Sequence, residues 1–262
     1  MAYQFVKFTV EAGVGTIVLN RPEVLNSFHR PMGREFQKAL EVCRDDPALR
    51  AVLITGEGRA FCAGQDLAEA APPGKPLADI RSIVEQTYNP AIRLIRAIEK
   101  PVVCAVNGVA AGAGANIALS CDIVLASEKA SFLQAFCHIG LVPDSGGTFF
   151  LPRLVGLPRA AAMMLLGEKI PAAEALGMGM IYKVYPPESL PEEALKLARH
   201  LAAQPTRGLG LTKRLLNQSL QNDLETQLNQ EAELQAAAGV TEDYQEGVQA
   251  FLEKRKANFK GR

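Results

Sequence analysis

Two turns of small residues follow apolar, strand-like runs in this chain. Ala63-Gly64 lies a short way after the run 51–56, and Gly112-Ala113-Gly114 lies after the run 102–106. A helix that starts at such a turn leaves backbone N–H groups without partners and adds partial positive charge. Small residues let another molecule approach those groups closely. The two turns could direct two N–H groups at one oxyanion, although glycine spacing alone fits a helix packed tightly on a strand equally well.

A single carboxylate occupies the segment Pro143-Asp144-Ser145-Gly146-Gly147. An aspartate at a helix entry is a common N-cap, and capping lowers its pKa. A catalytic base works best with a raised pKa, which burial among apolar groups supplies. The expected apolar neighbours are Phe136, Phe149 and Phe150. Asp144 is therefore either a helix cap or a base.

The other reactive side chains form no recognisable site. His29, His138 and His200 lack the spacing of a triad or a metal site, so we expect no metal, and His138 is a core or lining residue. The five cysteines include no C-x-x-C pair, which indicates free thiols in a reducing compartment.

The bulk composition limits the classes of protein. The 262 residues are 48% apolar, and 28 basic residues balance 28 acidic ones. No global basic field favours nucleic acid, and a net charge near zero favours self-association. The segment 1–5 does not resemble a signal peptide, and no apolar run reaches the roughly 18 residues of a membrane span. We expect a soluble, cytoplasmic protein.

Alternating strands and helices to about residue 200 predict an α/β layer structure. The predicted elements are a hairpin (3–10 and 15–20), a helix (34–43), a strand (51–56), a loop (71–76), a helix capped by Asp79 (80–98), and strands at 102–106, 123–126 and 131–133. From Thr148 onward the chain reads mostly as helix, apart from a short run at 181–184. The tail from about 206 is amphipathic, which fits packing on its own domain or self-association.

Five segments resemble the crotonase (enoyl-CoA hydratase/isomerase) superfamily, and together they span nearly the whole chain. They are 20–27, 51–67, 102–120, 141–148 and 251–256. The resemblance implies an α/β fold built as a spiral of ββα repeats. It also implies a core over 1–200 for acyl-CoA binding and catalysis. A C-terminal helical region over 201–262 would form a homotrimer or hexamer and part of the CoA site.

The resemblance also implies residue roles. The backbone N–H groups of Gln65 and Ala113 would form the oxyanion hole, and their side chains would matter little to the bond itself. Lys254 would either meet a CoA phosphate, from the same or a neighbouring subunit, or face solvent. No separate cofactor is expected, because CoA is part of the substrate. The implied CoA contacts are Val24, Leu25, Ala63, Gly64, Asp66 and Leu67. The implied acyl pocket consists of Tyr88, Asn89, Asn116 and Phe136.

The chain departs from the hydratases of this superfamily at the acid/base positions. The two glutamates of those hydratases align with Asn116 and Phe136, and neither side chain can act as a base. The lone Asp144 resembles the members that use one aspartate to shift a double bond. One base can lift a proton from C2 of a thioester and return it to C4, while two N–H donors stabilise the enolate.

Four short sequence segments indicate which reaction of this superfamily to expect. The segments 61–67, 88–90, 141–148 and 204–211 look most like the members that convert the ring-1,2-epoxide of phenylacetyl-CoA to an oxepin-CoA and also shift Δ3 double bonds to Δ2. The alternatives are an enoyl-CoA hydratase and a non-catalytic RNA-binding or scaffold protein, for which the basic cluster 254–256 is short. The dehalogenating members carry histidine and tryptophan at the positions of Asn89 and Phe136, which weighs against that reaction.

Overall fold

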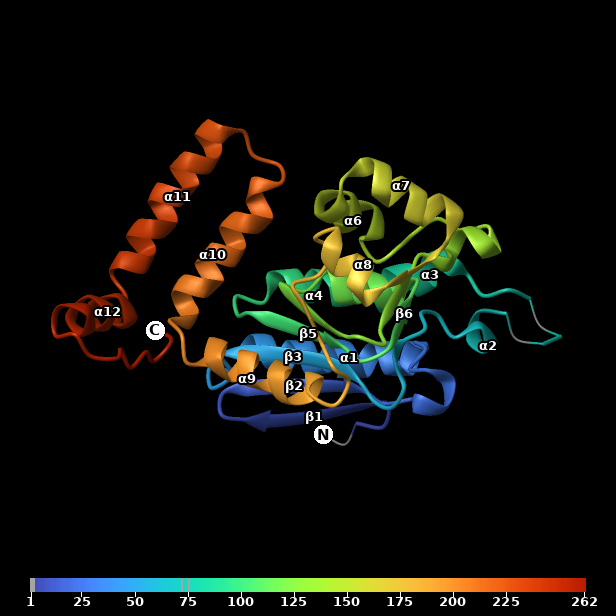
Figure 1. The fold of residues 1–262 in the computed structure, drawn as a ribbon, viewed down its shortest axis with the longest axis horizontal. Helices are drawn as coiled ribbons and strands as arrows, with labels where there is room; N and C mark the ends of the chain where they lie inside the picture. Colours follow the sequence, from blue (N-terminus) through green and yellow to red (C-terminus); the bar gives the residue numbers. More distant parts are fainter. Residues whose placement is uncertain (1–2, 72, 75) are drawn as a thin grey trace.

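The larger of two sheets forms the base of the molecule (Figure 1). A computed structural model describes residues 3–71, 73–74 and 76–262. In spatial order the sheet contains β1 (Val6–Glu11), β2 (Val14–Leu19), β3 (Ala51–Gly56), β5 (Val102–Val106), β7 (Ile123–Ser127) and β10 (Lys183–Tyr185). β1 and β2 form the predicted antiparallel hairpin, and the other neighbours pair in parallel.

A smaller sheet is formed mainly by short strands that each follow a strand of the larger sheet along the chain. In spatial order it contains β4 (Ala60–Cys62), β6 (Val109–Ala111), β8 (Ser131–Leu133) and β9 (Lys169–Pro171). After β4, β6 and β8 come the short helices α2 (Leu67–Ala70), α5 (Ala113–Leu119) and η3 (Ala135–Ile139). Each of β3, β5 and β7 is thus followed by a short strand and a helix, which is the ββα repeat. The sequence did not predict β4, β6 or β9.

Two helices cover opposite faces of the larger sheet. The apolar stripe of α1 (Arg30–Asp45) packs on β1 and β2, and α1 extends beyond the predicted 34–43 at both ends. α9 (Leu190–Ala202) packs on β3, β5 and β7. Alternate residues of β3 belong to the two resulting cores, Val52 and Ile54 with α1 and Leu53 with α9. A strand that is buried on both faces reads as a continuous apolar run, as 51–56 does.

The helix predicted at 80–98 is interrupted by a wider turn. It consists of α3 (Ile80–Ile83), a π-helical turn η2 (Val84–Tyr88) and α4 (Asn89–Ala97). The Asp79 carboxylate accepts a hydrogen bond from the Arg81 N–H at 3.1 Å, which confirms the predicted cap. Tyr88 and the apolar residues Ile80 and Ile83 of α3 lie on one side of the chain, where they line a cavity together with residues of η3.

The segment after residue 147 is mostly helical, as predicted. It forms α6 (Gly147–Val155), α7 (Leu157–Leu166) and α8 (Ala172–Gly177) above the sheets (Figure 1). Two residues of the loop predicted at 71–76, Pro72 and Lys75, lie outside the described residues, as do Met1 and Ala2. None of the helices in the described ranges is long and apolar enough to cross a bilayer.

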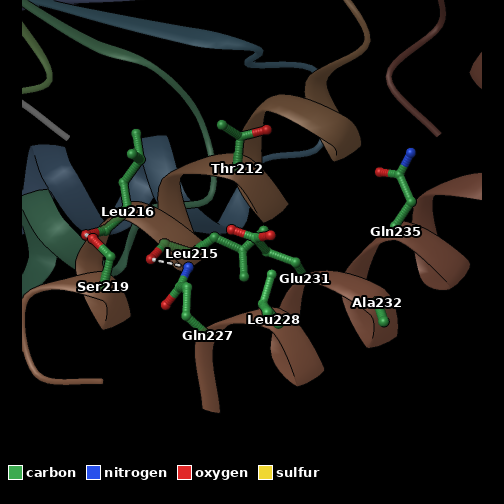
Figure 2. Close-up of a pocket in the computed structure, with 9 residues that line it drawn as sticks. All are labelled: Thr212, Leu215, Leu216, Ser219, Gln227, Leu228, Glu231, Ala232 and Gln235. Carbon is green, nitrogen blue, oxygen red and sulfur yellow. Dashed lines mark hydrogen bonds between the residues drawn. The ribbon is translucent and has the colours of Figure 1, made fainter. Parts of the chain in front are cut away.

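The C-terminal helices extend away from the sheets (Figure 1). They are α10 (Thr206–Ser219), α11 (Leu224–Gly239) and α12 (Glu242–Leu252). α10 and α11 pair along a groove in which Leu215, Leu216 and Leu228 lie (Figure 2). α11 has no buried residue within the described chain, and Leu224 is 75% exposed. The tail therefore presents leucines that its own chain leaves uncovered.

A buried ion pair attaches this tail to the core. Lys213 of α10 is 6% exposed, and its Nζ lies 2.8 Å from Asp122 Oδ2. The same ammonium donates to the Ile95 carbonyl oxygen at 2.8 Å. Arg96 donates to the other oxygen of Asp122 at 2.8 Å. Burial lowers the pKa of Lys213, and the charge of Asp122 opposes that effect.

Replacing Asp122 with asparagine should destabilise the protein by about 3 kcal/mol, because a buried ammonium loses its counter-charge. Lys213→Met should cost less, since Asp122 keeps Arg96. Urea denaturation followed by circular dichroism measures both free energies of unfolding. Equal losses in the two variants would contradict this account.

Candidate active site

Backbone hydrogen bonds hold the first small-residue turn, at Ala63-Gly64, against the segment before α1. Phe28 donates its N–H to the Gly64 carbonyl at 2.7 Å, and its carbonyl accepts from the Asp66 N–H at 2.8 Å. Gln65 lies between these two bonds, in a parallel bridge to Phe28. Its own N–H forms no hydrogen bond with any residue that the structure describes. This N–H is therefore available to another molecule.

The second turn brings a helix start to the same place. α5 begins at Ala113, so the N–H of this residue has no acceptor within the helix. A Cβ added at Gly64 would lie 3.7 Å from the Ala113 nitrogen and 2.9 Å from the Ala111 carbonyl oxygen. Gly64 also has a φ of +90°, where residues with a side chain are strained. Only glycine thus lets the two turns come this close.

Further small residues complete this contact. A Cβ at Gly114 would collide with the carbonyl oxygen and the Sγ atom of Cys62. Cys62 is fully buried, which raises the pKa of its thiol to about 12. Its Sγ atom accepts a hydrogen bond from the Gly64 N–H at 3.4 Å. The thiol is therefore a neutral packing group between the turns.

A cavity of about 220 Å³ joins the two turns to the predicted carboxylate. Its lining residues are Ala63, Gly64, Gln65, Leu67, Ile80, Ile83, Val84, Tyr88, Gly112, Ala113, Ala135, Phe136, His138, Ile139, Leu141 and Asp144. Most of these side chains are apolar, so the cavity suits an acyl group. The sequence singled out Asp144, Gln65 and Ala113, and all three face this space.

Asp144 is a partly buried carboxylate and not a helix cap. α6 begins at Gly147 with Gly146 as its cap residue, and the Asp144 Oδ1 atom instead accepts from the Ser145 hydroxyl at 2.8 Å. Burial raises the pKa of Asp144, while the Ser145 bond partly opposes the rise. Of the two sequence-based alternatives, the structure contradicts the capping one. A carboxylate with a raised pKa suits proton transfer near neutral pH.

Two buried amides hold the backbone at Asp144. Asn116 is fully buried on α5, and its Nδ2 donates to the Asp144 carbonyl oxygen at 2.9 Å. Gln134 Nε2 donates to Asn116 Oδ1 at 2.8 Å. The segment that they hold contains Ser145 with a φ of +52°, a strained value for a residue with a side chain. These amides thus stabilise a conformation that the local sequence would not adopt by itself.

The residues predicted for the acyl pocket divide between the cavity lining and positions outside it. Tyr88 and Phe136 line the cavity, but Asn89 and Asn116 are not among the described residues that do. Asn89 begins α4, and Asn116 acts behind Asp144. The expected neighbours Phe149 and Phe150 also lie outside the lining and pack edge to face with ring centroids 5.1 Å apart.

The residues predicted to contact CoA divide into two groups. Ala63, Gly64 and Leu67 line the cavity. Leu25, after the 3-10 turn η1 (Pro22–Val24), accepts a hydrogen bond from the Ala63 N–H at 3.0 Å. Asp66 caps α2 and pairs with Arg21 at 2.9 Å. These residues form a continuous rim beside the cavity, and Val24 is 38% exposed on it.

Lys254 lies apart from this rim. It follows α12, which is at the opposite side of the molecule from α2 and α3 (Figure 1). A contact with CoA at this cavity would therefore have to come from another copy of the chain. Of the alternatives predicted for Lys254, which is exposed, a contact from a neighbouring subunit and a position facing solvent remain.

Sequence reasoning missed the wall formed by Ile80, Ile83 and Val84. Their helical spacing predicted one apolar face, which gave no sign of whether it faced a core or a cavity. His138 also lines the cavity, and its Nε2 lies 2.9 Å from the Gly167 carbonyl oxygen.

Comparison with known proteins places this geometry in a family. The family model described as "Enoyl-CoA hydratase/isomerase" matches residues 9–262. This chain belongs to the enoyl-CoA hydratase/isomerase family. It is 48% identical over 260 residues to the 1,2-epoxyphenylacetyl-CoA isomerase of Escherichia coli K12, covering 99% of each chain. It is 43% identical over 262 residues to a protein of Rhodobacter capsulatus named "Probable enoyl-CoA hydratase", covering all of both.

A solved structure of the family confirms the fold. The enoyl-CoA hydratase of Bacillus anthracis superposes with a TM-score of 0.94 at 33% identity, covering 99% of this chain and 100% of that one. The predicted α/β crotonase fold is therefore confirmed. Relatives with both isomerase and hydratase names share it, so the reaction has to be argued from the site.

The variant Asn116→Asp should raise the pKa of Asp144, because a carboxylate replaces the amide next to it. Since a base works in its ionised form, the acid limb of kcat/KM should move to higher pH. On the acid limb itself, a shift of about one pKa unit lowers activity on the order of tenfold. The pH profile of acyl-CoA turnover measures both effects.

Asn107→Asp is the matched control, because Asn107 donates to the Gly58 carbonyl at 2.8 Å at the turn between β5 and β6. It makes the same chemical change away from the cavity. An acid limb that moves in the control and not in Asn116→Asp would contradict the role of Asn116.

Proposed function

We propose that this protein is an acyl-CoA isomerase that moves a double bond through a thioester enolate. Asp144 is the base, and the backbone N–H groups of Gln65 and Ala113 are the oxyanion donors. The observation that carries the proposal is their common cavity, which holds one carboxylate with a raised pKa and two N–H groups without partners among the described residues.

The site residues can account for each proton in this reaction. A thioester bound with its carbonyl oxygen at the two N–H groups has acidified hydrogens at C2. Asp144 removes one of them, and the negative charge moves onto the oxygen. One such donor is typically worth about 10²–10³-fold in rate. The same carboxyl group then returns the proton to C4, so substrate and product are isomers and no cofactor beyond the CoA of the substrate is required.

The substrate that we propose is the ring-1,2-epoxide of phenylacetyl-CoA, converted to oxepin-CoA, or a linear Δ3-enoyl-CoA converted to the Δ2 isomer. The transfer from C2 to C4 describes the linear substrate. In the epoxide, the carbon–carbon bond shared by the six-membered ring and the epoxide opens to give the seven-membered oxepin ring, and the proton removed from C2 is returned to a ring carbon, so substrate and product are again isomers. The Escherichia coli relative named as a 1,2-epoxyphenylacetyl-CoA isomerase supports the first. The apolar lining of the cavity supports both. In this proposal the protein belongs to phenylacetate degradation.

Hydration of a double bond would place different demands on the site. Positioning a water and relaying its protons takes two carboxylates in the family hydratases. Here the corresponding positions are Asn116, with both amide groups hydrogen-bonded, and Phe136, an apolar wall residue. Among the described residues that line the cavity, Asp144 is the one carboxylate. This arrangement favours isomerisation.

Asp144→Asn should lower isomerase turnover by about 10³-fold, because the base is removed while the shape of the cavity is kept. The assay incubates ring-epoxide and 3-enoyl-CoA thioesters with the protein and separates the products. Turnover near that of the wild type would sink the proposal. Hydration of crotonyl-CoA without any isomerisation would replace it with the hydratase alternative.

The same variant provides its own folding control. Because burial raises the pKa of Asp144 in the folded chain, the stability that this group contributes is present at acid pH and is lost as the pH rises through the folded pKa. Asp144→Asn should therefore be at least as stable as the wild type at pH 7. A large drop in melting temperature would mean that lost folding explains the lost activity.

We also propose that the helices of 201–262 assemble the chain into a homotrimer or hexamer around the core of 1–200. Leu224 and Leu228 on α11 are 75% and 49% exposed, and such leucines favour burial against another copy. This arrangement could also bring Lys254 of one copy to the CoA rim of the next.

Leu228→Glu should dissociate the oligomer, because it places a charge in an apolar contact. Asn229→Glu adds the same charge at the next, exposed position and should leave the assembly intact. Size-exclusion chromatography with light scattering measures the mass of each. A monomeric wild type would contradict the assembly proposal and leave the proposed reaction untouched.

A further inference from the structure

The side chain of Gln65 is hydrogen-bonded at both ends, although only its backbone N–H has a role in the proposed chemistry. The Tyr88 hydroxyl donates to Gln65 Oε1 at 2.8 Å. At the other end, Gln65 Nε2 donates to Glu69 Oε2 at 3.1 Å and to the Asp66 carbonyl oxygen at 3.3 Å. A side chain beside an apolar cavity is thereby held in one orientation.

Glu69 connects this chain of bonds to the start of α1. Both oxygens of its carboxylate accept from the Arg30 N–H at 3.1 Å. Arg30 is the first residue of α1, where a carboxylate is stabilised by the helix dipole. The bonds from Tyr88 through Gln65 and Glu69 to Arg30 thus tie the turn after β4 to two separate helices.

Tyr88 is a well-anchored donor. It ends the π-helical turn η2, is 1% exposed, and its ring lies 5.9 Å from the Phe28 ring, centroid to centroid. Burial raises the pKa of Tyr88 well above its usual value, so the hydroxyl keeps its proton at any pH near neutrality. Phe28 is also the residue whose backbone holds both neighbours of Gln65.

We propose that Tyr88 and Glu69 are positioning residues, which hold Gln65 so that its N–H stays aimed at the substrate oxyanion. The proposal rests on the oxyanion role given to Gln65 above. A hydrogen bond weakens steeply when its angle departs from linearity, and preorganised donors gain most from fixed geometry. The side chain of Gln65 therefore affects the hydrogen bond from its own backbone N–H to the oxyanion, although the side chain takes no part in that bond.

The experiment compares Tyr88→Phe, Gln65→Met and the double variant. The first removes one hydroxyl and keeps the ring against Phe28, and the second keeps side-chain length without hydrogen bonds. Thr55→Val is the matched control, because its hydroxyl donates to the Ala105 carbonyl at 2.8 Å within the larger sheet. Two quantities are measured: the split between kcat and KM, and the infrared stretch of a bound trans-2-enoyl-CoA with ¹³C at the thioester carbonyl.

Tyr88→Phe should lower kcat by about tenfold with KM within about threefold, a smaller loss than that of a whole donor because the N–H is misaligned and not removed. The carbonyl stretch, which binding to the wild type shifts to lower wavenumber, should shift less in Tyr88→Phe and in Gln65→Met. The double variant should be no worse than the poorer single one, since both break one chain of bonds. Thr55→Val should match the wild type in both measurements.

Two results would separate the possible failures. If the bound thioester shows no carbonyl shift even in the wild type, the oxyanion role itself fails, and with it the proposed function. If the wild type shows the shift and Tyr88→Phe keeps it in full, the oxyanion role stands and the positioning role of Tyr88 is wrong. A rise in KM alone would likewise overturn it, because it would mean that Tyr88 contacts the substrate directly.

Discussion

Two stretches of main chain approach each other at Gly64 and Ala113 more closely than side chains would allow. The approach follows from the parallel pairing of β4 and β6, which delivers both turns to one edge of the smaller sheet. The N–H groups exposed here belong to the backbone, so no side chain supplies them. The residues around them therefore determine which reaction the proposed site carries out. The shape of the cavity and the placing of its carboxylate both depend on this contact.

Asp144 shows how such tuning is achieved. Its carboxyl group is desolvated by the cavity wall, one hydroxyl from Ser145 limits the effect, and the amide of Asn116 holds its backbone. An amide at position 116 carries no charge, so it supports the carboxylate without competing for a proton.

The sequence predicted the main elements because their signals are local. The run 51–56 is apolar since β3 is buried on both faces, and Asp79 marks a helix start by its chemistry. β4, β6 and β9 were missed because three residues give little local signal and these strands depend on pairing with distant ones, although the equally short β8 was predicted. That Asn89 and Asn116 lie outside the cavity lining could not be predicted for a similar reason: sequence spacing does not say which side of a helix borders a cavity.

Because of the wide π-helical turn η2, the number of residues between α3 and α4 affects the shape of the cavity as much as their identity does. An α-helix advances by about 100° per residue, so deleting one residue of 84–88 would let regular α-helix run through the segment but rotate α3 by that angle relative to α4. The side chains of Ile80 and Ile83 would then point away from the cavity that they now line, while the helix backbone kept its hydrogen bonds. Homologues that differ by one residue here would share the fold and present a differently shaped pocket.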